Sequence, residues 1–137
     1  MMVVMIMEKS IIEIEKDWAM NKYSVLAKSN AIYLEIRELL KNKTNDISNA
    51  YLDLIQKAYS MPDNVGEMIN AYYHVFGYFK KNSTISEKQT FLELTDNFSK
   101  NTVIDSEVKE FLYGLAKKYN SKYLLKSRYF NKIAIKI

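Results

Sequence analysis

The chain of 137 residues lacks cysteine altogether and contains one proline, three glycines and one histidine. Without cysteine it has no disulfides, thiolate metal sites, iron–sulfur clusters or cysteine nucleophiles, which fits a reducing cytosol. A glycine-rich phosphate loop, a nucleophile elbow and a metal-spaced set of histidine and carboxylate residues are also missing. We therefore expect no enzymatic activity, no catalytic residues, no metal and no cofactor.

Long hydrophobic runs are missing as well. The segment 1–7, MMVVMIM, is apolar, but a helix that spans a bilayer needs about 20 such residues. No basic stretch or small-residue cleavage site accompanies it, so it does not resemble a secretion signal. We interpret it as a disordered or packing N-terminal arm, and we expect a cytoplasmic protein without membrane contact.

Acidic residues are absent after Glu110. The last 27 residues carry a charge of +7 and the first 110 carry −3, within a net charge of +4. A block of cations at one end of a chain suggests a polyanionic partner. The cations of this block are Lys117, Lys118, Lys122, Lys126, Arg128, Lys132 and Lys136.

Tyrosines interleave with these cations. Lysine and arginine contact phosphates and aromatic rings stack on unpaired bases, so this composition suits RNA. The alternative is a solvated helix face with Tyr123 and Leu124 in the core. The predicted nucleic-acid-binding residues are Lys80, Lys81, Lys117, Lys118, Lys122, Lys126, Arg128, Lys132, Tyr119, Tyr123 and Tyr129.

Apolar residues recur at helical spacing along the chain, and no strand-period segment of useful length appears outside the termini. The pattern predicts an all-α, single-domain bundle of five to six helices. A capping box of Ser86 with Gln89 would start the fourth helix, and Asp105 would cap the fifth. The other helices are expected at about 8–41, from 47 to the break at 60–63, at 63–81 and at 122–130.

Helical spacing also predicts the core. The expected inward positions are Trp18, Val25, Leu26, Ile32, Tyr33, Ile36, Leu39, Leu40, Ile47, Tyr51, Leu54, Ile55, Ala58, Phe76, Phe79, Phe91, Leu94, Thr95, Phe98, Val108, Phe111, Leu112, Leu115 and Tyr119.

The segment 70–81, NAYYHVFGYFKK, is the most distinctive of the chain. Asn70, His74 and Tyr78 lie four residues apart, so one helix face carries all three as secondary candidates for binding. That face could present an imidazole and a phenol to a phosphate or a base. A structural role for His74 within the core is favoured, because no nucleophile or ligand set lies near it. Gly77 is expected where a neighbouring helix crosses closely.

This segment resembles the YbgA-like family, a domain of unknown function. The family pattern of Asn, then His four residues later, then Gly-Tyr-Phe-Lys matches Asn70, His74 and 77–80. The resemblance covers about 16–131, which leaves 1–15 as the arm and the start of the first helix, and 132–137 as a basic tail.

The resemblance implies a function as well as a domain. Relatives occur alone or fused behind a thiouracil/thiouridine desulfidase domain, where the YbgA-like domain is implied to bind tRNA. Desulfidase chemistry needs cysteines that hold a cluster, so only the binding role could transfer to this chain. We therefore predict a non-catalytic RNA-binding accessory domain, for tRNA above all, with a desulfidase as a candidate partner in trans.

Two other functions stay open. One is a protein-interaction or homodimerisation module that binds no nucleic acid and uses MMVVMIM and the apolar stripe of the first helix. The other is a small-molecule pocket near His74, for which a ligand-sized cavity beside that residue would be the sign.

Overall fold

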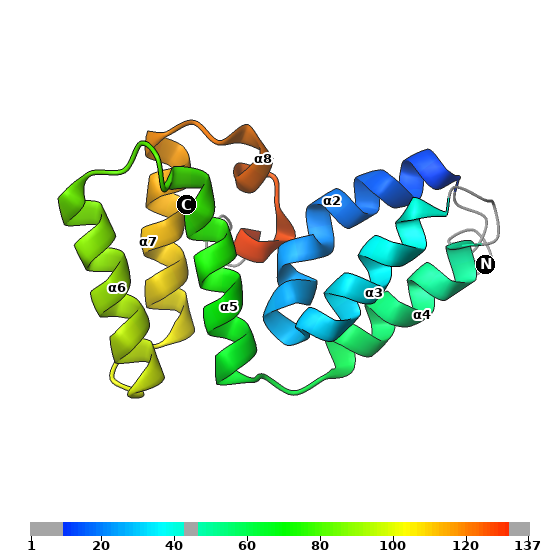
Figure 1. Ribbon diagram of the computed structural model, residues 1–137, viewed down its shortest axis with the longest axis horizontal. Coiled ribbons are helices and arrows are strands. Elements are labelled where there is room, and N and C mark those ends of the chain that lie inside the picture. The colour runs from blue at the N-terminus through cyan, green and yellow to red at the C-terminus, as the bar shows by residue number, and fades with distance from the viewer. Residues whose placement is uncertain (1–9, 43–46, 132–137) are drawn as a thin grey trace.

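The computed structural model describes residues 10–42 and 47–131, and in these ranges it contains seven α-helices and no strand (Figure 1). The prediction of an all-α fold is confirmed. No helix in the described ranges is long and apolar enough to cross a membrane. The helices are α2 (Ile11–Lys28), α3 (Asn30–Lys41), α4 (Ile47–Ser60), α5 (Val65–Phe76), α6 (Ile85–Ser99), α7 (Asp105–Lys118) and α8 (Lys122–Leu125).

The helices form two groups that meet along α2 and α5. In Figure 1, α2, α3 and α4 lie side by side at one end, and α5, α6 and α7 lie at the other. Two short 3₁₀ segments complete the chain, η1 (Gly77–Phe79) after α5 and η2 (Arg128–Phe130) after α8. Because α8 packs on α7 and η2 packs on α2, the C-terminal segment joins the two groups.

The first predicted helix, 8–41, is in fact two helices. Ser29 has an extended backbone with φ −161° and ψ 113°, and its hydroxyl accepts a 3.1 Å hydrogen bond from the Ile32 amide. Its side chain thereby caps α3, while its own amide donates to the Val25 carbonyl at 2.8 Å and closes α2. The apolar stripe continues across this break, which allows α2 and α3 to fold against each other.

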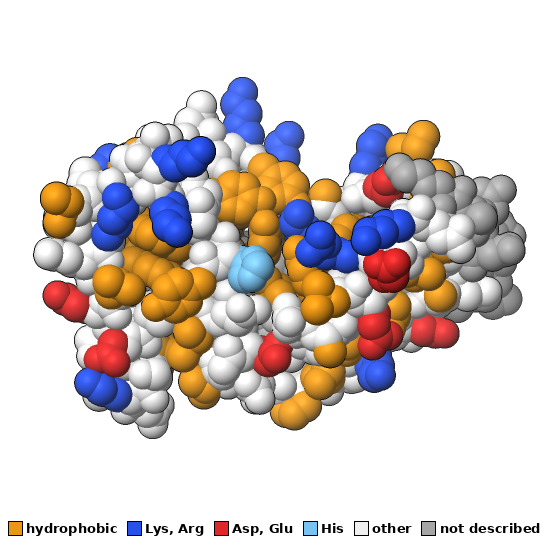
Figure 2. All heavy atoms as spheres, in the orientation of Figure 1, with side chains coloured by type: hydrophobic (Ala, Val, Ile, Leu, Met, Phe, Trp, Pro, Cys, Tyr) orange, Lys and Arg blue, Asp and Glu red, His pale blue; other side chains and the backbone are white. Residues whose placement is uncertain are grey.

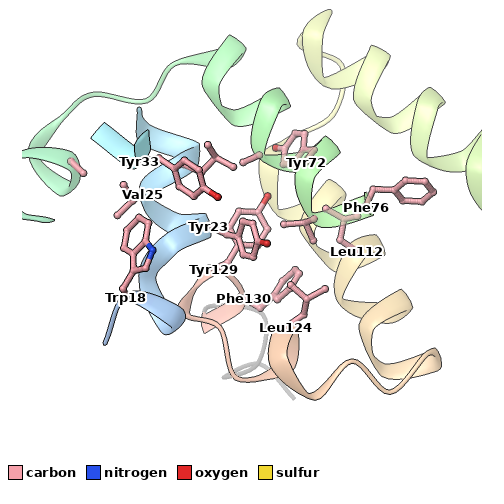
Figure 3. Close-up of a cluster of buried hydrophobic side chains, with 14 of the residues drawn as sticks. Trp18, Tyr23, Val25, Tyr33, Tyr72, Phe76, Leu112, Leu124, Tyr129 and Phe130 are labelled. Carbon is pink, nitrogen blue, oxygen red and sulfur yellow. The ribbon is translucent and has the colours of Figure 1, made fainter. Parts of the chain in front are cut away.

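The core lies where the two groups meet, and aromatic side chains fill much of it (Figure 3). Val25, Leu26, Ile36 and Leu112 are 0% exposed, as helical spacing predicts. Tyr51 and Tyr72 are also fully buried, and each donates its hydroxyl to a carboxylate, of Asp17 and Asp105 respectively. All the other predicted inward positions are buried or partly buried against this core.

Two predicted helix starts are wrong. The capping box of α6 is Thr84 with Glu87, whose side chain and backbone bond each other reciprocally, and not Ser86 with Gln89. Asp105 is the first residue of α7 and does not cap it, since its carboxylate accepts from Tyr72 and pairs with Lys109 at 3.3 Å.

Two predicted helices are also shorter than expected. The helix at 63–81 gives way to a 3₁₀ turn after Phe76, and the one at 122–130 divides into α8 and η2. The predicted arm MMVVMIM and the tail 132–137, with Lys132 and Lys136, lie outside the described residues.

Candidate nucleic-acid interface

Helix α5 presents the distinctive segment of the sequence to solvent along one side. The Asn64 side chain starts the helix by accepting a 3.0 Å hydrogen bond from the Glu67 amide. Tyr72, Val75 and Phe76 then turn into the core, while the opposite side carries Asn70, Tyr73, His74, Gly77 and Tyr78.

His74 is exposed, so the expectation that it serves the core is wrong. Its imidazole makes no hydrogen bond with any residue in the described ranges. Its nearest aromatic contact is Tyr33 of α3, whose ring centroid lies 6.5 Å away. The side chain is thus free to bind a group from outside.

Gly77 is not at a helix crossing either. A Cβ built there would meet no heavy atom within 4 Å, and the backbone is right-handed, with φ −53° and ψ −27°. Neither packing nor backbone conformation therefore requires glycine at this position. The absent side chain instead leaves open space on the molecular surface beside His74.

Three tyrosines from distant parts of the chain gather next to this segment. The Tyr23 and Tyr78 hydroxyl oxygens lie 2.7 Å apart, and the rings of Tyr78 and Tyr123 are nearly parallel, with centroids 6.0 Å apart. The Tyr123 hydroxyl donates to the Ala19 carbonyl at 3.0 Å, which fixes α8 on α2. Tyr78 and Tyr123 remain 42% and 37% exposed, so their rings contribute to the surface.

These tyrosines stay protonated over a wide pH range. Burial, with the neighbouring Tyr78 and Tyr33, raises the pKa of Tyr123 to about 12. Burial also raises the pKa of Tyr23 and of Tyr78 above the ordinary value of a phenol. The cluster therefore carries no negative charge that would repel a polyanion.

Two cations from the first helix group lie beside tyrosine rings, Lys22 beside this cluster and Arg37 beside Tyr33. The Lys22 Nζ lies 5.3 and 5.5 Å from the ring centroids of Tyr23 and Tyr123, and the Arg37 guanidinium lies 5.8 Å from that of Tyr33. Partial burial, and secondarily the charge of Arg37, lower the pKa of Lys22. Sequence reasoning missed both cations as binding residues, because they lie in the part of the chain with net charge −3.

A hollow of about 630 Å³ lies on the other side of His74, between α5, η1 and α6. Lys80 and Lys88 stand among its polar lining residues, with Asn70 and His74. Figure 2 shows the single histidine in the middle of one face, with blue cationic side chains on both sides of it. We call this surface the His74 face and define it by Lys22, Arg37, Asn70, Tyr73, His74, Gly77, Tyr78, Lys80, Lys88 and Tyr123.

The C-terminal cations that the structure describes, from Lys117 to Arg128, are exposed but differ in their contacts. Lys118 pairs with Glu87 at 2.7 Å, and Tyr119 donates to the same carboxylate at 2.6 Å. Both bonds, the Lys118 bond first, together with the Thr84 amide, lower the pKa of Glu87 to about 2. Lys117, Lys122 and Lys126 make no ion pair with the described part of the chain. Of Tyr119, Tyr123 and Tyr129, only Tyr123 joins the His74 face.

Tyr129 and Arg128 lie away from that face. Tyr129 is 4% exposed, so the prediction that its ring contacts RNA is wrong: η2 inserts it into the core. Arg128 donates to the Asn21 side chain at 3.1 Å and lines a second hollow, of about 490 Å³. The lysines of that hollow are already paired with its acids, Lys28 with Asp63 and Lys109 with Asp105.

No solved structure and no curated protein matches the chain. A family model described as Protein of unknown function (DUF1722) matches residues 22–133, which include the whole His74 face. The YbgA-like family, whose pattern 70–80 resembles, is a DUF1722 family. By this match over most of its length, the chain belongs to the DUF1722 family of proteins of unknown function.

Proposed function

We propose that the chain is a non-catalytic RNA-binding accessory domain whose contact surface is the His74 face. One observation carries the proposal: on this face, cations that form no ion pair with the described residues surround exposed aromatic rings. Phosphates would bind the cations, and unpaired bases would stack on the rings.

The pairing of the cations supports this surface. Lys22, Arg37, Lys80 and Lys88 form no ion pair with the residues that the structure describes. Elsewhere in the described ranges, carboxylates hold five lysines at 2.7–3.3 Å: Lys28, Lys41, Lys100, Lys109 and Lys118. A paired lysine must give up its carboxylate before it binds a phosphate, whereas an unpaired one exchanges only mobile counterions.

The exposed rings support a nucleic acid with unpaired bases over polyanions that have no bases. Tyr73, Tyr78 and Tyr123 are 49%, 42% and 37% exposed, so a base can stack on them. The raised pKa of Tyr78 and of Tyr123 keeps these two rings uncharged. Stacking on an aromatic side chain contributes about 1–3 kcal/mol per base, which a polyanion without bases would not gain.

Transfer RNA is the RNA we propose. Relatives of YbgA-like type occur fused behind a thiouracil/thiouridine desulfidase domain, which implies a tRNA substrate. This chain has no cysteine, so the desulfidase chemistry would belong to other residues. We propose a desulfidase partner in trans in the cytoplasm, with the chain presenting the tRNA to it.

Three double variants, each lacking two positive charges, test the surface. Arg37→Ala with Lys80→Ala changes the His74 face, Lys117→Ala with Lys126→Ala changes the C-terminal surface, and Lys41→Ala with Lys100→Ala is the control. All six side chains are exposed. Fluorescence anisotropy with total tRNA would measure the affinity of each at several salt concentrations.

We expect the first variant to lose the most affinity and its salt slope to fall by roughly 1.4–1.8, because two phosphate contacts disappear. Equal losses in all three variants would contradict a defined surface. A larger loss in the second variant would assign binding to the C-terminal cations instead. Failure of the wild type to bind tRNA at low salt would end the proposal.

Self-association is the competing function. One of the two surfaces predicted for it is the apolar stripe of the first predicted helix. That stripe packs into the core of the chain, since Trp18 is 7% exposed and Val25 and Leu26 are 0% exposed. The other predicted surface, MMVVMIM, lies outside the described residues. Light scattering that finds a stable dimer, combined with no affinity for tRNA, would favour this function over RNA binding.

A further inference from the structure

The hollow beside His74 has the features of a site for one flat, partly polar group. Its volume, about 630 Å³, lies within the range of ligand sites, roughly 300–1,000 Å³. Gly77 borders it, and a side chain there would project into the open space.

Aromatic rings form the apolar part of the hollow. Phe76 of α5 and Phe91 of α6 stack face to face, with centroids 4.2 Å apart and planes 7° apart. Tyr73 contacts Phe91 edge-on at 5.1 Å and is 49% exposed, and the neighbouring Leu92 is 53% exposed. Aromatic groups prefer such ring surfaces in offset or edge-on arrangements. The apolar wall thus favours a planar aromatic ligand.

The polar rim offers bonds to the edge of such a ligand. The Asn70 amide and the His74 imidazole make no hydrogen bond within the described ranges. An amide supplies both donors and an acceptor, which suits the edge of a base. Within the described ranges, Lys80 forms no ion pair. In the same ranges the Lys88 ammonium makes one hydrogen bond, to the Ser83 carbonyl at 3.3 Å. Neither ammonium group is held by a carboxylate, so both can bind a phosphate next to the hollow.

From this arrangement we infer that the hollow binds a single unpaired base of RNA, with the adjoining phosphate on Lys80 and Lys88. The inference rests on the proposed function and names where one base lies. The base stacks against the exposed ring of Tyr73, above the buried pair of Phe76 and Phe91, and its edge bonds to Asn70 and His74. Base recognition in single-stranded RNA commonly combines these two contacts.

The test uses two labelled oligomers, an oligouridylate of about eight nucleotides and an abasic oligomer of the same length. We expect the wild type to bind the oligouridylate about tenfold more tightly, as stacking of one base allows. Gly77→Leu would place a bulky side chain at the border of the hollow, where it obstructs a base, without removing a charge. Its affinity for the oligouridylate should fall about tenfold, towards that for the abasic oligomer, while the salt slope stays unchanged.

Gly114→Leu is the matched control. Gly114 is an exposed helical glycine of α7 whose Cβ would also meet open space, so both variants make the same change. The control should bind like the wild type. We expect both variants to fold, because the space at each site is open. Thermal melts followed by circular dichroism would verify this.

A second readout uses the only histidine of the chain. In untagged protein, the imidazole signals in a ¹H–¹³C spectrum belong to His74 alone. Addition of uridine 5′-monophosphate should shift them in the wild type and not in Gly77→Leu.

The outcomes separate the inference from the proposed function. If Gly77→Leu binds the oligouridylate like the wild type, the base lies elsewhere, and the inference is wrong while RNA binding stands. If the wild type binds neither oligomer nor tRNA, the proposed function fails and the inference fails with it. If it binds both oligomers equally, only phosphate contacts exist and the hollow takes no base.

Discussion

Buried tyrosines in this protein differ in whether their hydroxyl groups have partners. Tyr51 is 0% exposed and donates a 2.6 Å hydrogen bond to Asp17. Tyr129 is 4% exposed, and its hydroxyl has no hydrogen-bond partner among the described residues. An unpaired buried hydroxyl destabilises a fold, whereas a bond to a charged group contributes about 1.5–3 kcal/mol. The same substitution should therefore have opposite effects at the two positions.

We predict that Tyr51→Phe lowers the free energy of unfolding by about 1.5–3 kcal/mol, because the bond to Asp17 is lost. Tyr129→Phe should leave it unchanged or raise it by up to about 1 kcal/mol. Urea denaturation followed by the fluorescence of Trp18, the single tryptophan, would measure both. A comparable loss in Tyr129→Phe would show that its hydroxyl has a partner, such as a buried water molecule.

Spacing alone placed Asn70, His74 and Tyr78 on one side of a helix and predicted Phe76 and Phe79 to be buried, as they are. It could not tell that the shared side is exposed. Aromatic residues flank the histidine in every direction along the sequence, so both sides of the helix look apolar. Only the position of α6 relative to α5 shows that Gly77 borders a hollow.

At the scale of elements, Ser29 determines the first turn of the fold. No glycine or proline marks the break between α2 and α3, and the apolar stripe continues through it, so periodicity predicts one long helix. The physical signal is a side chain that caps the next helix, and a serine within a helical pattern is too common to reveal it.

We expect Ser29→Ala to lower the free energy of unfolding by about 1 kcal/mol, the usual effect of losing an N-cap. Its hydroxyl accepts from the Ile32 amide, and the substitution leaves that buried amide without a partner. Ser99→Ala, at an exposed helix end, is the control and should change stability by less than about 0.5 kcal/mol. Equal effects would mean that chain connectivity, and not the cap, sets the break.

Glu87 links the start of α6 to the end of α7. Two overlapping patterns, Thr84 with Glu87 and Ser86 with Gln89, both fit a capping box, so the sequence could not choose between them. The structure has the first, in which the carboxylate also accepts from Lys118 and Tyr119. The helix dipole further favours a negatively charged carboxylate near a helix N-terminus, and a glutamine carries no such charge.

The low pKa of Glu87 predicts a pH-dependent stability. Its pKa is about 2 in the folded chain and 4.5 ordinarily, so its contribution is complete above pH 4.5 and is lost as the pH falls towards 2. Glu87→Gln should therefore melt at a lower temperature than the wild type at pH 7, and the difference should shrink between pH 4.5 and pH 2. A difference that stays constant over this interval would contradict the assigned contacts.

For the whole molecule, the order of charged residues in the sequence predicts only part of their arrangement on the surface. The C-terminal block of cations is real, yet Lys118 is neutralised by Glu87 and Arg128 points to a separate hollow. The His74 face instead combines Lys22 and Arg37 of the first helix group with Lys80 and Lys88 of the second. A run of residues could not reveal such a surface, because its members are up to about a hundred positions apart and meet only when α2 packs on α5 and α8.

The number of cations on this surface predicts how RNA binding depends on salt. The His74 face has four cations, Lys22, Arg37, Lys80 and Lys88. Lys81 lies outside that definition but follows Lys80, is exposed and has no ion pair within the described ranges, so we count it as a fifth. If each neutralises one phosphate, log affinity should fall against log salt with a slope of roughly −3.5 on single strands and −4.5 on duplex. Anisotropy titrations with an unpaired oligomer and with a hairpin stem would measure the two slopes. Slopes near −1 would contradict a five-cation surface, and a steeper slope than five contacts allow would show that the C-terminal cations also bind phosphate.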